Sequence, residues 1–203
     1  MSEKLKVIVF LSSARVGESY LGNGSWGDRV GGVIKEVLDD ADFEVSVWDP
    51  KANPYQVLQQ PMHMIKDTSV FPQWMHDKKA ELESADAFFI CSAEYNSVLP
   101  PALTNMLDHY PPAAYKHRPV ALVTYSVSPL GGVRVQPALK TLVTELGMLP
   151  IPTIGRVAQV RDKFVDDILK DEGVRQSMTK QAKELSWYAR ALKTYKADTP
   201  MPS

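Results

Sequence analysis

The sequence predicts an α/β fold of three layers, in which a five-stranded parallel sheet has helices on both faces. Two observations lead to this prediction. Apolar runs of strand length alternate along the chain with segments of helical periodicity, and such alternation requires a parallel sheet with right-handed crossovers. The runs at residues 5–11, 87–91 and 119–125 are almost continuously apolar, as strands buried on both faces are.

The first half of the chain supplies three strands and two helices. Residues 5–11 are rich in β-branched side chains and predict the first strand. Residues 28–40 place apolar side chains at helical spacing and predict the first helix. The alternation at 43–49 predicts a second strand near the sheet edge, because one of its sides is polar. Residues 73–84 have helical spacing and lead to 87–91, the predicted central strand.

The alternation continues after the central strand. A helix is expected at 99–108, where prolines stand at positions that a first helical turn tolerates. Residues 119–125 predict a fourth, buried strand. Residues 137–146 predict an amphipathic helix that Gly147 ends as a C-terminal cap.

The chain ends with an edge strand and a long helix. Prolines within residues 148–154 mark the fifth strand as an edge strand. A buried stripe of apolar residues predicts the last helix at about 166–195, with a break near Gly173. We expect residues 196–203 to be a frayed tail, and the whole chain, residues 1–203, to form one domain.

Composition narrows the class of partner. The net charge is −1 and the basic residues are scattered, which argues against a nucleic acid or an anionic membrane. No apolar run is long enough to cross a bilayer. Cys91 is the only cysteine and the first residues contain no signal-peptide core, so we expect a cytoplasmic protein. A small-molecule partner is the expectation that remains.

Residues 50–72 form a proline-punctuated segment that is too apolar for a solvated loop. A long apolar loop usually covers a site or meets a second subunit. We favour a subunit contact, and packing of the segment over the protein's own helices remains the alternative.

Polar loops follow the first and third strands. Residues 12–15 bring serine hydroxyls and the Arg15 guanidinium to the end of the first strand, which suits a phosphate. The alternative is a helix-capping serine with a surface arginine. Residues 93–97 offer backbone N–H groups, the Tyr95 ring and the Asn96 amide, which suit a flat heteroaromatic ring. The alternatives are a polar turn with Asn96 as a helix cap and Tyr95 as a core aromatic.

A third polar loop, residues 126–132, follows the fourth strand. It ends in Gly131 and Gly132, which let the backbone approach a flat ligand and present its N–H groups. Turns also need glycine, so the pair alone is weak evidence.

Three further features of the sequence bear on other kinds of chemistry. Residues 22–27 match the dinucleotide fingerprint G-x-G-x-x-G, but in a true fingerprint the first glycine follows the strand at once. The alternative interpretation of this stretch is a surface loop that binds no ligand. The histidines lack metal-site spacing, and we expect surface or capping roles for them; they are His63, His76, His109 and His117. Cys91 lies in the central strand and is expected to be a small buried hydrophobe.

At the three loops the sequence resembles the NAD(P)H-dependent FMN reductase family, which includes quinone and azo-dye reductases. Ser12-Ser13-Ala14-Arg15 looks like its Gly-Ser-x-Arg phosphate loop, with serine in place of glycine. Ala93-Glu94-Tyr95-Asn96 looks like its Pro-Glu-Tyr-Asn loop, with alanine in place of proline, and Pro101 to Asp108 resemble the helix that follows. Tyr125 to Gly132 are similar to its third flavin loop.

The resemblance implies a flavodoxin-like sheet in the order 2-1-3-4-5, in which the three loops surround one crevice. It implies bound FMN as cofactor, with NADPH or NADH as co-substrate and a quinone, azo compound or free flavin as acceptor in a ping-pong reaction. The flavin carries the chemistry, so no catalytic side chain is expected. The implied cofactor-binding residues are Ser13, Arg15, Ser19, Ala93, Glu94, Tyr95, Asn96, Ser97, Tyr125, Ser126, Gly131 and Gly132.

Two other functions stay open at this point. A flavodoxin-like electron carrier would bind FMN without turnover of its own; such carriers are usually acidic, whereas this chain is nearly neutral. A nicotinamide-dinucleotide enzyme would use the glycine stretch at 22–27. A homodimer or homotetramer is expected from the 50–72 segment and from the family likeness.

Overall fold

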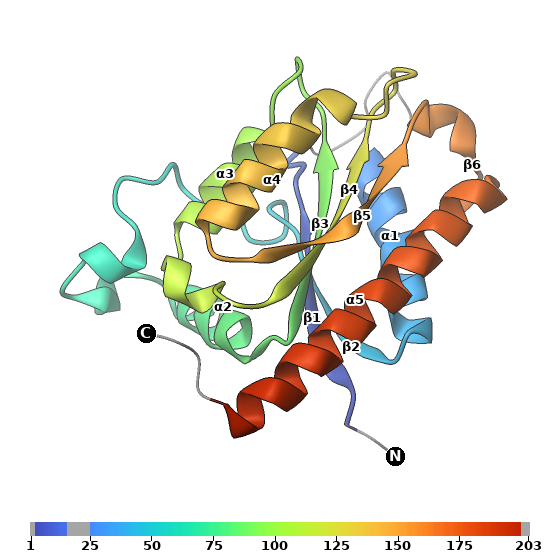
Figure 1. Cartoon of the computed structure of the whole chain (residues 1–203). Helices are drawn as coiled ribbons and strands as arrows, with labels where there is room; N and C mark the ends of the chain where they lie inside the picture. Colours follow the sequence, from blue (N-terminus) through green and yellow to red (C-terminus); the bar gives the residue numbers. More distant parts are fainter. Residues whose placement is uncertain (1–2, 16–24, 200–203) are drawn as a thin grey trace.

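The main sheet has five parallel strands in the order β2-β1-β3-β4-β5 (Figure 1). The computed structural model describes residues 3–15 and 25–199. The strands are β1 (Leu5–Leu11), β2 (Phe43–Trp48), β3 (Ala87–Ala93), β4 (Pro119–Tyr125) and β5 (Leu149–Val157). The strand order and the shared direction confirm the predicted flavodoxin-like fold class.

Helices cover both faces of the sheet, which gives three layers (Figure 1). One face carries α1 (Trp26–Asp40) and α5 (Glu172–Asp198). The other carries α2 (Gln73–Ser84), α3 (Pro101–Asp108) and α4 (Gln136–Glu145).

Each face of the sheet has its own apolar core, and β1 shows how the sequence divides between them. Val7 and Val9 point into the core under α1 and α5, whereas Ile8 and Phe10 point into the core under α2, α3 and α4. Side chains alternate across a strand, so a strand between two cores must be apolar throughout. Each such side chain contributes about 1.5–3 kcal/mol on burial.

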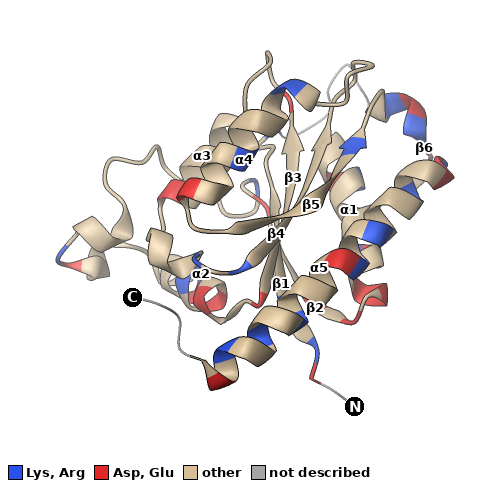
Figure 2. Ribbon diagram, viewed as in Figure 1, with Lys and Arg blue, Asp and Glu red and all other residues tan. Residues whose placement is uncertain are grey.

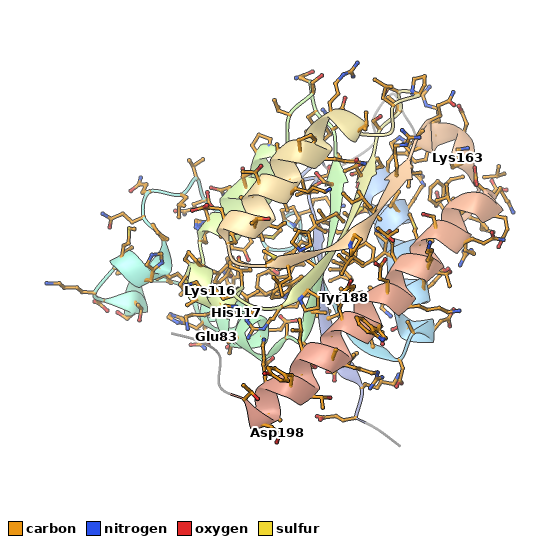
Figure 3. The ribbon with its side chains drawn as sticks, viewed as in Figure 1. Glu83, Lys116, His117, Lys163, Tyr188 and Asp198 are labelled. Atoms are coloured by element: carbon orange, nitrogen blue, oxygen red, sulfur yellow. The ribbon has the colours of Figure 1, made fainter. Side chains whose placement is uncertain are left out.

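Capping residues place the helix starts differently from the apolar pattern. Ser25 caps α1, its side chain accepting from the Asp28 N–H, so the helix begins at Trp26 and not at Asp28. Asp171 caps α5 by accepting from the Val174 N–H, and Lys163, labelled in Figure 3, pairs with Asp171. The expected start near residue 166 is therefore wrong.

The residues before α5 form structure that the pattern did not indicate. A 3₁₀ turn, Val160–Lys163, leads into a short antiparallel hairpin of β6 (Phe164–Val165) and β7 (Ile168–Leu169). The helix is unbroken at Gly173, which lies in its first turn, and continues to Asp198. Residues 196–198 therefore belong to the helix and not to a tail, and residues 200–203 lie outside the described residues.

A buried side chain of α5 completes the hydrogen bonding of the sheet edge. The β4–β5 pairing shifts register between Val120 and Leu122. Gln181 is fully buried there, and its Nε2 donates to Leu122 O at 3.0 Å and to Thr153 O at 2.9 Å. The amide thus satisfies carbonyls of both strands at the irregular point.

The 50–72 segment packs partly on the protein and partly faces outward. It contains two 3₁₀ turns, Met62–Met64 and Thr68–Val70. Met62 is buried in the second core and Tyr55 packs against that core, so the alternative of packing over the protein's own helices holds for this part. Three other apolar side chains remain exposed; they are Val57, Met64 and Val70.

Charged side chains of both signs are spread over the outer faces of the helices (Figure 2). Within the described residues, no helix is both long enough and apolar enough to cross a membrane.

Candidate functional site

Two hydrogen bonds bring together the carboxyl ends of β1, β3 and β4, which are neighbours in the sheet. Ser12 Oγ accepts from the Ala93 N–H at 2.8 Å, which links the first loop to the end of β3. The Glu94 N–H donates to Tyr125 O at 3.1 Å, which links the second loop to the end of β4. The three predicted loops therefore meet at one edge, where open α/β sheets bind their ligands.

Side chains of the first and second loops are in direct contact. The Ser13 Oγ lies 2.6 Å from the Tyr95 hydroxyl oxygen, and the Arg15 N–H donates to Ser13 Oγ at 3.3 Å. The Arg15 guanidinium carbon lies 3.8 Å from the centre of the Tyr95 ring, a cation–π contact. Tyr95 is partly buried and packs against the core under α1 and α5, as the core-aromatic alternative expected, while its hydroxyl and ring contact the first loop.

The donors of this corner suit an anion. Arg15 is exposed, and among the described residues no carboxylate lies within ion-pair distance of it. The first turn of α1 is close by, since a Cβ built on Gly27 would lie 3.6 Å from Ser13 Cβ. A helix N-terminus and an arginine both favour phosphate.

Gly27 bears on the fingerprint hypothesis. Its added Cβ would come within 2.7 Å of the Tyr125 hydroxyl, so Gly27 allows α1 to pack against β4. It lies inside α1. The other fingerprint glycines, Gly22 and Gly24, and the predicted site residue Ser19 lie outside the described residues.

The second loop is a tight turn with strained backbone. Tyr95 and Val98 exchange both backbone hydrogen bonds, at 3.1 and 3.0 Å. The two residues between them, Asn96 and Ser97, have φ angles of 52° and 65°, which is the left-handed pattern of a type I′ turn. Both are exposed. Non-glycine residues in this region cost free energy, and such residues cluster at ligand sites.

The capping alternative for Asn96 is wrong. The next helix, α3, begins at Pro101, and its N-cap is Pro100, without a side-chain hydrogen bond. Asn96 instead lies at the tip of the exposed turn.

Glu94 links the second loop to the third. Its side chain is only 7% exposed, and one carboxylate oxygen accepts from the Arg134 N–H at 3.3 Å. The other pairs with the Arg134 guanidinium at 3.2 Å. Arg134 was not among the site residues predicted from the sequence. Its position two residues after the paired glycines is the feature that could have indicated it.

The third loop is held by Thr124, whose hydroxyl donates to Gly131 O at 2.9 Å. Gly131 and Gly132 have φ angles of 59° and 82°, so both positions favour glycine. Ser126 donates its N–H to Val157 O, and its hydroxyl lies 2.8 Å from Ser128 Oγ. The Gly131 N–H donates to Ser128 O at 3.3 Å, so this amide serves the loop and not the crevice.

Two buried titratable groups near the site stay in their neutral forms. Burial raises the pKa of Tyr125 well above its ordinary value, so its phenol stays protonated. Burial likewise raises the pKa of Cys91, which is fully buried. This confirms Cys91 as a buried hydrophobe and excludes it as a nucleophile.

His109 is not a surface residue but is the C-cap of α3, so the capping role expected for it holds. His109 is buried, and its Nε2 lies 3.1 Å from Gln56 O, which ties the 50–72 segment to the end of α3. His63 is exposed and His76 and His117 are partly exposed. The described residues contain no group of three or more His, Cys, Asp or Glu side chains that could hold a metal ion.

With this geometry in view, comparison with known proteins decides the family. Residues 5–161 match the model of a family described as NADPH-dependent FMN reductase. The chain belongs to this family. FMN is accordingly the cofactor and NAD(P)H the co-substrate of this FMN reductase.

Solved structures agree on the fold. FerB, a flavoenzyme NAD(P)H:(acceptor) oxidoreductase from Paracoccus denitrificans, matches with a TM-score of 0.70 at 16% identity, over 92% of this chain and 98% of that one. The apo form of an NADH:FMN oxidoreductase, EMOB, matches with a TM-score of 0.61 at 14% identity, over 97% and 92%. A flavodoxin from the domain Archaea matches with a TM-score of 0.54 at 12% identity, over 91% and 98%.

The residues of the reductase fit FMN. Ser13 and Arg15 carry side-chain donors that would suit a phosphate at this edge of the sheet, whereas the first turn of α1 already uses Ser25 and Asp28 in a capping box. The turn at 94–97 and the loop at 126–132 lie side by side, joined through the Glu94–Tyr125 and Glu94–Arg134 bonds. Asn96 and Ser97 are the exposed groups of this pair of loops that would suit a flat ring, whereas Gly131 and Gly132 are buried.

Proposed function

We propose that this FMN reductase oxidises NADPH or NADH and passes two electrons to a quinone, an azo compound or a free flavin in a ping-pong reaction. FMN, when bound, accepts hydride at its N5 and returns the electrons to the acceptor. The observation that carries the proposal is the direct contact of Ser13, Arg15 and Tyr95, which joins a phosphate corner to a ring-binding turn. The family match supports it.

In this proposal the chain binds and orients, and no side chain transfers a proton. Ser13 and Arg15 hold the phosphate, with Ser19 as a further contact. Residues 93–97 border one side of the ring. Tyr125, Ser126, Gly131 and Gly132 border the other. We expect the pyridine nucleotide to leave before the acceptor enters, as a ping-pong reaction requires.

The second candidate is a flavodoxin-like electron carrier, favoured by the likeness of fold to the archaeal flavodoxin. Such a carrier would bind FMN without turnover. The near-neutral charge of the chain favours the enzyme, since carriers are usually acidic around the flavin.

A steady-state assay with NADPH and a benzoquinone tests the proposal. We expect a yellow protein with the absorption bands of bound FMN, and double-reciprocal plots that stay parallel as the acceptor concentration changes. Bound flavin without turnover would leave the carrier as the better assignment. Protein that binds no flavin under any condition would remove both assignments.

We further propose that the enzyme acts as a cytoplasmic homodimer or homotetramer of one-domain chains, with the 50–72 segment in the contact. An outward groove of about 480 Å³ lies against this segment and includes Tyr55, Val57, Phe71 and Trp74 in its lining. Val57 and Val70 are 86% and 67% exposed. Exposed apolar side chains next to an aromatic groove are typical of a protein contact.

A further inference from the structure

The Glu94–Arg134 ion pair joins two loops of the crevice across 40 residues of sequence. The two partners differ in exposure. The Glu94 side chain is 7% exposed, whereas that of Arg134 is 52% exposed. A carboxylate removed from water needs compensation, and Arg134 supplies it through its backbone N–H and its guanidinium.

The pair also lies at the two loops that the proposed function places around the flavin ring. Glu94 directly precedes Tyr95, which contacts Ser13 and Arg15. Arg134 follows the paired glycines of the third loop. Under the proposed function the ring lies between these two loops, and reduction adds negative charge to it. A nearby carboxylate opposes that change and a nearby cation favours it.

We propose that the Glu94–Arg134 pair sets the reduction potential of bound FMN: Glu94 lowers it and Arg134 offsets that effect. The inference rests on the proposed function, because it needs FMN between the 94–97 turn and the 126–132 loop. It predicts opposite effects for the two partners, which a purely structural role for the pair does not.

Two substitutions each remove one charge and keep the hydrogen bond between residue 94 and the backbone of residue 134. Glu94→Gln keeps an oxygen that can accept from the Arg134 N–H, and removes the negative charge. Arg134→Gln keeps the backbone N–H and removes the positive charge. In a spectroscopic redox titration against a reference dye, we expect the potential to rise in Glu94→Gln and to fall in Arg134→Gln. The double variant should return toward the wild-type value.

Flavin affinity gives a readout that does not depend on activity. FMN is titrated into FMN-free protein in its oxidised form and, under anaerobic conditions, in its reduced form. We expect the ratio of oxidised to reduced Kd to increase several-fold in Glu94→Gln and to decrease several-fold in Arg134→Gln. A pair that only holds the loops together would weaken both oxidation states by the same factor, and that result would overturn the inference.

Two further variants serve as controls. Lys140 is an exposed residue of α4, so Lys140→Gln removes a cation from the helix that follows Arg134 and should leave the Kd ratio unchanged. Arg134→Lys keeps the charge and should restore most of the wild-type ratio. Single variants that move the ratio in the same direction would also refute the inference. Wild-type protein without affinity for FMN would instead overturn the proposed function, and the inference with it.

Discussion

Among the residues of the proposed site, we expect phosphate binding to depend most directly on Arg15. Its guanidinium carbon lies 3.8 Å from the centre of the Tyr95 ring, a contact that restrains the side chain. We expect Arg15→Ala to weaken FMN binding about 10- to 100-fold, because hydrogen bonds to charged groups contribute about 1.5–3 kcal/mol. Quenching of FMN fluorescence on titration into FMN-free protein measures this.

Arg15→Lys should lose less affinity than Arg15→Ala, since it keeps the charge but not the planar donor pair. Arg190 pairs with Asp42 away from this site, so Arg190→Ala is the control and should keep the wild-type affinity for FMN. Equal affinity in the wild type and in Arg15→Ala would contradict the assigned role.

Two glycines give a matched prediction about stability. Gly131 has a φ angle of 59°, and an added Cβ would lie 2.6 Å from Arg156 Cγ and 2.8 Å from the Ala158 backbone. Gly131→Ala should therefore destabilise the protein by about 1–3 kcal/mol. Gly32 lies inside α1, and an added Cβ meets nothing within 4 Å. Gly32→Ala should stabilise by about 0.5–1 kcal/mol.

Thermal unfolding of the FMN-free forms checks this pair, because bound cofactor would add its own stabilisation. A melting temperature that falls in both variants, or in neither, would show that backbone conformation does not govern these two positions.

At the level of residues, the sequence predicted the members of each loop but not the contacts that they make with distant parts of the chain. Ser13, Arg15 and Tyr95 were each predicted from their own loops, and the structure brings them into contact. The Glu94–Arg134 pair could not be predicted, since its members are distant in sequence and neither has a local pattern that names the other.

At the level of elements, the link between the 50–72 segment and α3 is sensitive to pH. Burial lowers the pKa of His109 below its ordinary value of 6.5. The unfolded chain therefore takes up this proton first as the pH falls. The contribution of His109 to stability is complete above about pH 6.5 and is lost as the pH falls from there toward the lower folded-state pKa.

When the pH is lowered from about 7.5 to about 5.5, we expect the melting temperature to fall less in His109→Phe than in the wild type. The ring also packs 5.0 Å from that of Tyr55, and phenylalanine preserves this contact. His63 is exposed, so His63→Phe should keep the wild-type dependence on pH. An unchanged slope in His109→Phe would mean that this histidine titrates alike in the folded and unfolded chains.

Element prediction succeeded where periodicity alone decides the structure. The strands between two cores and the amphipathic helices agree with the apolar pattern. It failed before α5, where the Asp171 cap and the β6–β7 hairpin determine the path. These features depend on single side chains and on very short strands, for which a periodic signal has too few residues.

At the level of the whole molecule, the open question is association. We expect sedimentation at micromolar concentration to give at least twice the chain mass of 22.6 kDa. The double variant Val57→Glu/Val70→Glu should shift the mass toward one chain, because charges would be buried at the contact. Trp187→Glu alters an equally exposed side chain on α5, 66% exposed, and should not change the mass. A wild-type monomer would refute the predicted contact.

The fold class followed from the sequence because alternation of strand and helix leaves few arrangements open. The strand order needed the family likeness, since periodicity does not say which strands are neighbours. The union of the three loops at one edge then follows from that order.

Gln181 lies beyond the residues that match the family, yet its side chain bonds to two strands of the sheet. The stretch of homology stops at residue 161, yet the β4–β5 edge of the sheet is completed by an amide twenty residues further on. A protein cut at that stop would leave the Leu122 and Thr153 carbonyls without this donor. We therefore expect the stable fold to need residues beyond the family match, so any shortened version for expression should retain α5.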